Sequence, residues 1–163
     1  MPTMDVDTSR VVGLDMGLSH LAIDSNGRKV ANPRFLKQAQ KNLKRKQQAL
    51  SRTKKGSARR AKARLLVAKA YERVANARND FQHKLSRQIV DDNQAVIVET
   101  LKVRNMMKNT CLAKHTGDAS WHALMTKLDY KARSRASIWS RLTRGLPAPR
   151  PAMSASTRWT PCR

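Results

Sequence analysis

Two acidic residues in the chain each come directly after a short apolar run. Asp15 follows residues 11–14 in VVGLDMGLSH, and Glu99 follows residues 95–98 in QAVIVETL. Runs of this kind are typical of buried strands. If the strands are neighbours in one sheet, the two carboxylates face each other and need a cation or a hydrogen-bond donor. Mg²⁺ ions held there could hydrolyse phosphodiesters, whereas the alternative is a pair of ordinary strand-end acids bonded to backbone amides or Lys.

The strand that carries Asp15 is expected to open a small antiparallel group. Residues 10–14 and 20–24 are predicted strands, and residues 28–31 are predicted to return after Asn26-Gly27. This dipeptide indicates a tight hairpin, because both residues accept the positive φ angles that a two-residue turn requires. Residues 95–98 are bounded by polar residues upstream and are expected to form a central strand.

A long antiparallel helical pair is predicted between these strands, over about residues 33–91. Asn32 is expected to cap the first helix with Pro33 at its first position, where a missing N–H costs nothing. A turn around Gly56 and Ser57 separates the two helices. A shorter helix over residues 119–131 is expected to pack on the sheet through Trp121. The predicted apolar seam of the pair consists of Leu36, Leu43 and Leu50 in the first helix and Ala63, Leu66, Val67, Ala70, Tyr71, Val74, Phe81 and Leu85 in the second.

The charge of the chain points to nucleic acid. Thirty-four Lys and Arg against 11 acids give a formal net charge of +23 and a pI near 11.4. Residues 34–73 hold fifteen of these cations and one acid, Glu72. Like charges this close along a helix repel each other, and binding of a polyanion would offset that repulsion. Salt-sensitive phosphate binding is expected, and no apolar run is long enough to suggest a membrane partner. The candidate contacts are Lys37, Lys41, Lys44, Arg45, Arg52, Lys54, Lys55, Arg59, Arg60 and Lys62.

The cysteines and histidines do not form a metal-binding pattern. Cys111 and Cys162 lie far apart and belong to no CxxC motif, so neither a zinc site nor a disulfide is predicted. Cys111, His115 and His122 have a spacing that is poor for a shared metal. This cysteine usage is typical of the reducing cytoplasm.

Five stretches in order resemble the TnpB/OrfB proteins of bacterial insertion sequences, a family of transposases. They are GLDMGLSHLA, NPRFLKQAQKNLKRKQQALSRTKKGS, ERVANARNDFQHKLS, VIVETLKVRNMMKN and DASWHALMTKLDYKA. The resemblance implies an α/β fold with an RNase H-like (RuvC) mixed sheet interrupted by a long basic helical hairpin. It also implies an RNA-guided DNA endonuclease, with DNA and guide RNA as partners in the bacterial cytoplasm, associated with the nucleoid. Asp15 and Glu99 match the first two catalytic acids and would hold Mg²⁺.

The chain departs from this family at both ends. Residues 1–9 are expected to be a disordered leader, residues 10–132 a partial nuclease domain, and residues 133–163 a disordered basic tail rich in Arg, Ser and Pro. The family's zinc ribbon and third catalytic aspartate are not found, and the sheet is expected to lack its closing strand, which leaves a bare edge. When the tail is back-translated and read from the third base of its codons, it yields a CxxC-like segment, which favours a frameshift near residues 133–135.

Three functions follow as hypotheses. The first is a truncated transposon nuclease that binds nucleic acid but does not cleave alone. The second is a nuclease completed in trans by a partner chain that supplies the missing parts. The third is a non-enzymatic basic nucleic-acid-binding protein, for which Asp15 and Glu99 would have no role.

Overall fold

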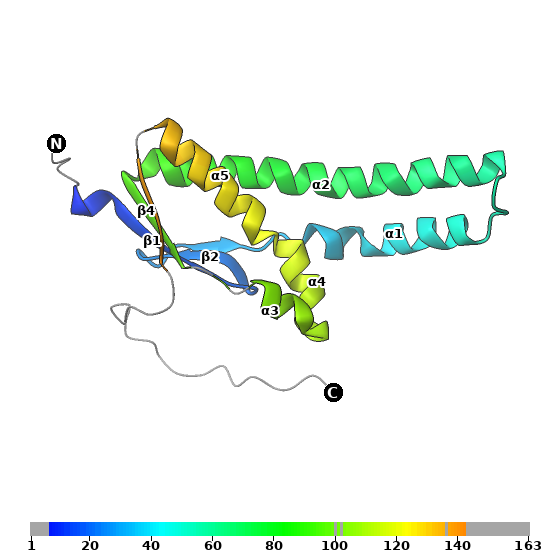
Figure 1. Ribbon diagram of the computed structural model, residues 1–163, viewed down its shortest axis with the longest axis horizontal. Coiled ribbons are helices and arrows are strands. Elements are labelled where there is room, and N and C mark those ends of the chain that lie inside the picture. The colour runs from blue at the N-terminus through cyan, green and yellow to red at the C-terminus, as the bar shows by residue number, and fades with distance from the viewer. Residues whose placement is uncertain (1–6, 100, 102, 136, 143–163) are drawn as a thin grey trace.

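A computed structural model of the chain describes residues 7–99, 101, 103–135 and 137–142. It is an α/β structure in which a mixed sheet is packed on helices and a helical pair projects away from it (Figure 1). The elements are a 3₁₀ turn η1 (Thr8–Arg10), β1 (Val11–Met16), β2 (His20–Asp24), β3 (Lys29–Ala31), α1 (Phe35–Ser51), α2 (Ala58–Asp92), β4 (Ala95–Glu99), α3 (Val103–Lys108), α4 (Thr110–Ala119), α5 (Trp121–Ser134) and β5 (Ile138–Leu142).

The five strands lie in the order β3-β2-β1-β4-β5. Strands β2 and β3 pair in antiparallel fashion on one side of β1, as predicted for the first three strands. On the other side β4 runs parallel to β1, and β5 runs parallel to β4. The sheet is therefore mixed, and β1 and β4 are its two inner parallel strands.

One face of the sheet forms the core. Alternate residues of β1, namely Val12, Leu14 and Met16, are buried, together with Val96 and Val98 of β4. They pack against the C-terminal half of α2 and against α5, which lies along that half of α2 (Figure 1). The helical residues of this core are Leu85, Val90, Trp121, Leu124, Met125, Leu128 and Ala132. Trp121 is 1% exposed, so the predicted anchoring of this helix through its tryptophan is confirmed.

The opposite face of the sheet is more open. Val11, Gly13 and Asp15 alternate with the buried residues of β1, and their exposure is partial or, for Asp15, high. Ile97 and Glu99 of β4 share this face, because the parallel register pairs Val11 with Ala95 and Gly13 with Ile97. The acidic pair therefore lies on the side of the sheet away from the core.

Helices α1 and α2 pack side by side to form an arm that extends away from the sheet (Figure 1). At about 1.5 Å per residue, the 35 residues of α2 span roughly 50 Å. The buried part of the arm is small and consists of Leu43, Ala70 and Val74. The predicted seam was too wide, since Leu66 is 52% exposed and Tyr71 is 45% exposed.

The start of α1 differs from the prediction. Asn32 does not cap the helix: its side chain accepts a hydrogen bond from the Arg34 backbone and donates one to the carbonyl of Leu18. Arg34 precedes α1 with a φ of 51° and no side-chain cap of its own. The free N–H groups of Leu36 and Lys37 instead donate to the carboxylate of Asp118 at the end of α4. A residue more than eighty positions away thus supplies the cap.

The turn between β2 and β3 also differs in detail. Only Gly27 has a positive φ, of 81°, so Asn26 is not in the left-handed region that the prediction assigned to it. The Asp24 carboxylate accepts hydrogen bonds from the backbone of Asn26 and Arg28. The Asp24 side chain therefore stabilises a longer loop, with glycine in the left-handed position.

Some of the described elements lie within the two segments that were expected to be disordered. At the start, Asp7 caps the turn η1 through a hydrogen bond from the backbone of Ser9. At the other end, α5 continues to Ser134 and β5 pairs with β4, so the expected bare edge at β4 is wrong. The β-branched and aromatic residues Ile138 and Trp139 in β5 outweigh the basic composition around them. Residues 1–6 and 143–163, including the rest of the expected tail, lie outside the described residues.

Lys127 makes the stability of this core depend on pH. It is 9% exposed, and its ammonium donates to the side-chain oxygen of buried Gln82. Burial lowers the pKa of Lys127, so the folded state releases this proton before the unfolded state does. Below the pKa of Lys127 in the folded state, the buried ammonium lowers the stability by its whole desolvation cost. This cost falls as the pH rises towards the pKa of Lys127 in the unfolded state.

Replacing Lys127 with methionine should remove this dependence. We expect the free energy of unfolding of the wild type to rise relative to that of Lys127→Met as the pH rises from the lowered pKa of folded Lys127 towards the ordinary pKa of lysine. Burial is the largest cause of the lowered pKa of Lys131 and acts in both proteins, whereas the smaller effect of the Lys127 charge is lost in the variant. Urea unfolding of both proteins at several pH values measures the difference between their free energies of unfolding. A difference that stays constant with pH would show that Lys127 does not titrate over the range measured.

No helix in the described part of the chain combines the length and the apolarity that a membrane crossing requires.

Candidate metal centre and nucleic-acid interface

Strands β1 and β4 bring Asp15 and Glu99 together. Leu14 of β1 is paired with Val98 of β4 in parallel register, so the next residues, Asp15 and Glu99, lie side by side. Alternation along the strands places both on the open face, while Leu14 and Val98 point into the core. The sequence predicts that the two acids are neighbours, and the register of the sheet places them so.

The two carboxyl groups interact directly. The pKa of Asp15 is raised, first by partial loss of water around it, then by the like charge of Glu99 and by a hydrogen bond between the two side chains. A hydrogen bond between two carboxyl groups requires a proton on one of them. Without a cation, the pair therefore favours retention of a proton that an isolated Asp would release.

The donor set of this pair fits a hard divalent cation. Carboxylate oxygens are preferred ligands of Mg²⁺ and Mn²⁺, and a cation between the groups would replace repulsion with attraction. Within the described residues, no three His, Cys, Asp or Glu side chains gather closely enough to hold a metal ion together. Asp15 and Glu99 would thus supply two ligands, and water or other groups would complete the coordination.

The candidate phosphate contacts lie along the arm. Nine of the ten are exposed, and none of the ten forms an ion pair with an acid in the part of the chain that the structure describes. Arg60 is the exception in exposure, because its guanidinium donates to the carbonyls of Leu50 and Thr53. Arg60 therefore ties the end of α1 to the start of α2, a structural role that the sequence did not indicate.

Sequence reasoning missed the role of Asp118 and the two arginines near the end of β4. The structure places Asp118 at the base of the arm, where its carboxylate contacts α1 and α2. Arg104 and Arg141 line a pocket together with His122, although they are 37 positions apart. Neither arginine belongs to a recognisable motif, so only the folding of α3 and β5 could bring them together.

The fold and the site define an α/β protein with a carboxylate pair at neighbouring strand ends and a cationic helical arm. Residues 2–110 match a family of the OrfB type described as "Probable transposase". The match covers well over half of the chain, and the chain belongs to this family.

Two curated relatives are similar to most of this chain. A "Putative RNA-guided DNA endonuclease" from Streptomyces pristinaespiralis is 43% identical over 124 residues, which cover 76% of this chain and 31% of that protein. The "Putative RNA-guided DNA endonuclease InsQ" from Escherichia coli (strain K12) is 28% identical over 139 residues, covering 76% of this chain and 35% of that protein. The chain spans about a third of the length of these relatives.

Proposed function

We propose that this chain is a TnpB-like protein that binds nucleic acid along its arm and holds a divalent metal ion between Asp15 and Glu99. The observation that carries the proposal is the direct contact of these two carboxyl groups on neighbouring parallel strands. The names of both relatives, RNA-guided DNA endonucleases, support DNA and RNA as the partners. The mixed sheet with acids at the ends of its inner strands supports an RNase H-like (RuvC) assignment.

Each part of the chain has a distinct task in this proposal. A bound Mg²⁺ would polarise a phosphodiester and lower the pKa of an attacking water. Asp15 and Glu99 would hold that ion at the open face of the sheet, where a strand can approach. The exposed cations of the arm would neutralise backbone phosphates and fix the path of the strand.

On its own the chain is proposed to bind rather than to cleave. A two-metal clamp needs more carboxylate ligands than the two that β1 and β4 supply. A partner chain, or further sequence of the same protein, would provide them. The proposed setting is the bacterial cytoplasm, at the nucleoid.

The metal site is tested by thermal unfolding with and without Mn²⁺ or Mg²⁺. A metal at ten times its Kd should stabilise the wild type by about 1.4 kcal/mol, which corresponds to a rise in Tm of about 3 to 6 °C. Asp15→Asn and Glu99→Gln should lose this rise. Glu72→Gln, which removes an exposed acid of the arm, should keep it.

The same experiment has a defined pH dependence. Because the pKa of Asp15 is raised in the folded state, protonation of Asp15 favours folding at low pH, and this contribution is lost as the pH rises through the folded pKa. The metal competes with that proton, so its stabilising effect should grow with pH in the wild type. In the absence of metal at neutral pH, Asp15→Asn should be more stable by a few tenths of a kcal/mol, since the side chain is exposed.

Two results would contradict the proposed metal site. One is an equal rise in Tm for the wild type and for both variants of the pair. The other is the absence of any effect of metal on a wild type that still binds DNA, which would instead support the non-enzymatic nucleic-acid-binding protein.

A further inference from the structure

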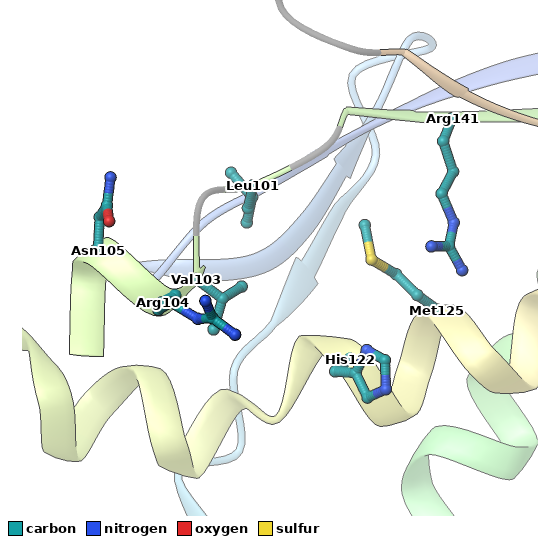
Figure 2. A pocket seen from close by; sticks show the side chains of 7 residues that line it. All are labelled: Leu101, Val103, Arg104, Asn105, His122, Met125 and Arg141. Carbon is teal, nitrogen blue, oxygen red and sulfur yellow. The ribbon is translucent and has the colours of Figure 1, made fainter.

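A pocket with a volume of about 520 Å³ lies beside the C-terminal end of β4. Two arginines from different elements line it: Arg104 of α3 and Arg141 of β5. His122, in the first turn of α5, lies between them on the helical side (Figure 2). Neither the acidic pair nor the arm includes any of these residues.

The fold fixes the backbone positions of Arg141 and His122. Arg141 is paired with Val98 in the parallel register of β4 and β5, one position before Glu99 in β4. His122 follows Trp121, which is 1% exposed and anchors the start of α5. In Figure 2, Arg141 extends from β5 towards α5, and Arg104 extends towards the same helix from the other side of the pocket.

The charged residues that line this pocket, Arg104 and Arg141, are both positive. In the part of the chain that the structure describes, neither Arg104 nor Arg141 forms an ion pair with an acid. Two guanidinium groups directed into one pocket repel each other unless an anion lies between them. The planar fork of a guanidinium matches the oxygens of a phosphate in bidentate geometry, and the ring of His122 adds another polar nitrogen.

Three apolar residues, Leu101, Val103 and Met125, also line the pocket, and Met125 is 8% exposed. Asn105 adds a polar amide to the lining. Pockets of roughly 300 to 1,000 Å³ that combine an apolar wall with a few convergent polar groups are typical of small-molecule sites. A nucleotide has both required parts, a phosphate for the arginines and a flat base for the apolar wall.

We propose that this pocket binds a single nucleotide of a nucleic-acid strand, with its phosphate between Arg104 and Arg141 and its base against Leu101 and Met125. The proposal of a phosphate site depends only on the two arginines that line this pocket. The choice of a nucleotide over another phosphate ester rests on the proposed function. The strand would then pass from the arm to the end of β4 close to Glu99.

The pocket is tested by calorimetric titration of the whole chain with thymidine 5′-monophosphate, thymidine and inorganic phosphate. The nucleotide should bind at least ten times more tightly than either thymidine or phosphate. Arg104→Gln and Arg141→Gln should each weaken nucleotide binding about tenfold or more. Arg133→Gln, an equal loss of charge at an exposed position of α5 outside the arm, should leave it unchanged.

Binding of a 40-nucleotide strand, measured in parallel, separates this proposal from the proposed function. If the long strand binds and the mononucleotide does not bind up to 10 mM, the pocket proposal is overturned while the arm proposal stands. Equal nucleotide binding by the wild type and both arginine variants would overturn it as well. Phosphate binding as tightly as the nucleotide would overturn the choice of ligand. Nucleotide binding without long-strand binding would support the pocket and contradict the proposed function of the arm.

Discussion

Replacing Asp118 with alanine is expected to lower the free energy of unfolding by about 3 to 5 kcal/mol, because it breaks a buried ion pair and removes a helix cap at once. Asp118 is 7% exposed and accepts hydrogen bonds from the backbone N–H groups of Leu36 and Lys37. It also accepts a hydrogen bond of 2.9 Å from the guanidinium of Arg78 in α2. One carboxylate therefore connects α4 to both helices of the arm.

Urea unfolding followed by circular dichroism measures this loss. Asp80→Ala is the matched control, since Asp80 is an exposed acid of α2 whose ion pair with Lys84 is exposed on both sides. That substitution should change the stability by less than about 1 kcal/mol. Arg78→Ala combined with Asp118→Ala should cost less than the sum of the single changes, because both remove the same contact. Additive losses would show that the two residues act independently.

The sheet could largely be predicted from the sequence because its strands carry local signals. The apolar runs before Asp15 and Glu99 are short, contain β-branched residues and end at polar positions, which favours buried strands whatever surrounds them. Asp15 and Glu99 are then neighbours because the strands that carry them, β1 and β4, pair in parallel. The chemical roles of Asp15 and Glu99 stay predictions, since position alone does not define a ligand.

The errors of sequence reasoning occur where distant contacts decide the local structure. Asn32 is a good capping residue, but Asp118 reaches the helix start across the fold and the side chain of Asn32 bonds elsewhere. In the same way, β5 pairs with the edge of β4, although the sequence around β5 is basic. A local pattern contains no information about either partner.

The width of the apolar stripe in α2 was overestimated for a related reason. A helix that packs on one neighbour buries a narrow seam, and only residues spaced by three or four face that neighbour. In the distal arm α2 packs on α1, and Ala70 and Val74 are buried there while Leu66 and Tyr71 stay largely exposed. Nearer the sheet the same helix also packs on α5, and the buried surface becomes wider there.

Neutralising four exposed cations of the arm is expected to weaken nucleic-acid binding about a thousandfold at 0.1 M salt. In the variant Lys41, Lys44, Arg45 and Lys55 are all replaced by glutamine. Each lost phosphate contact lowers the slope of log K against log salt by about 0.9 for duplex DNA, so the slope should fall by about 3.6. Fluorescence anisotropy with 40-mer DNA and RNA at several salt concentrations measures both quantities.

The matched control removes the same net charge from exposed cations that pair with acids. Arg28, Lys84, Arg87 and Arg133 are exposed, and each pairs with an acid, so their charges are already partly compensated. Replacing these four with glutamine should change the slope by less than about one unit if the arm is the interface. An equal fall in slope for both variants would instead mean that the overall charge, and not the arm, attracts the polyanion. The difference between the two slopes therefore decides whether binding is localised at the unpaired cations of the arm.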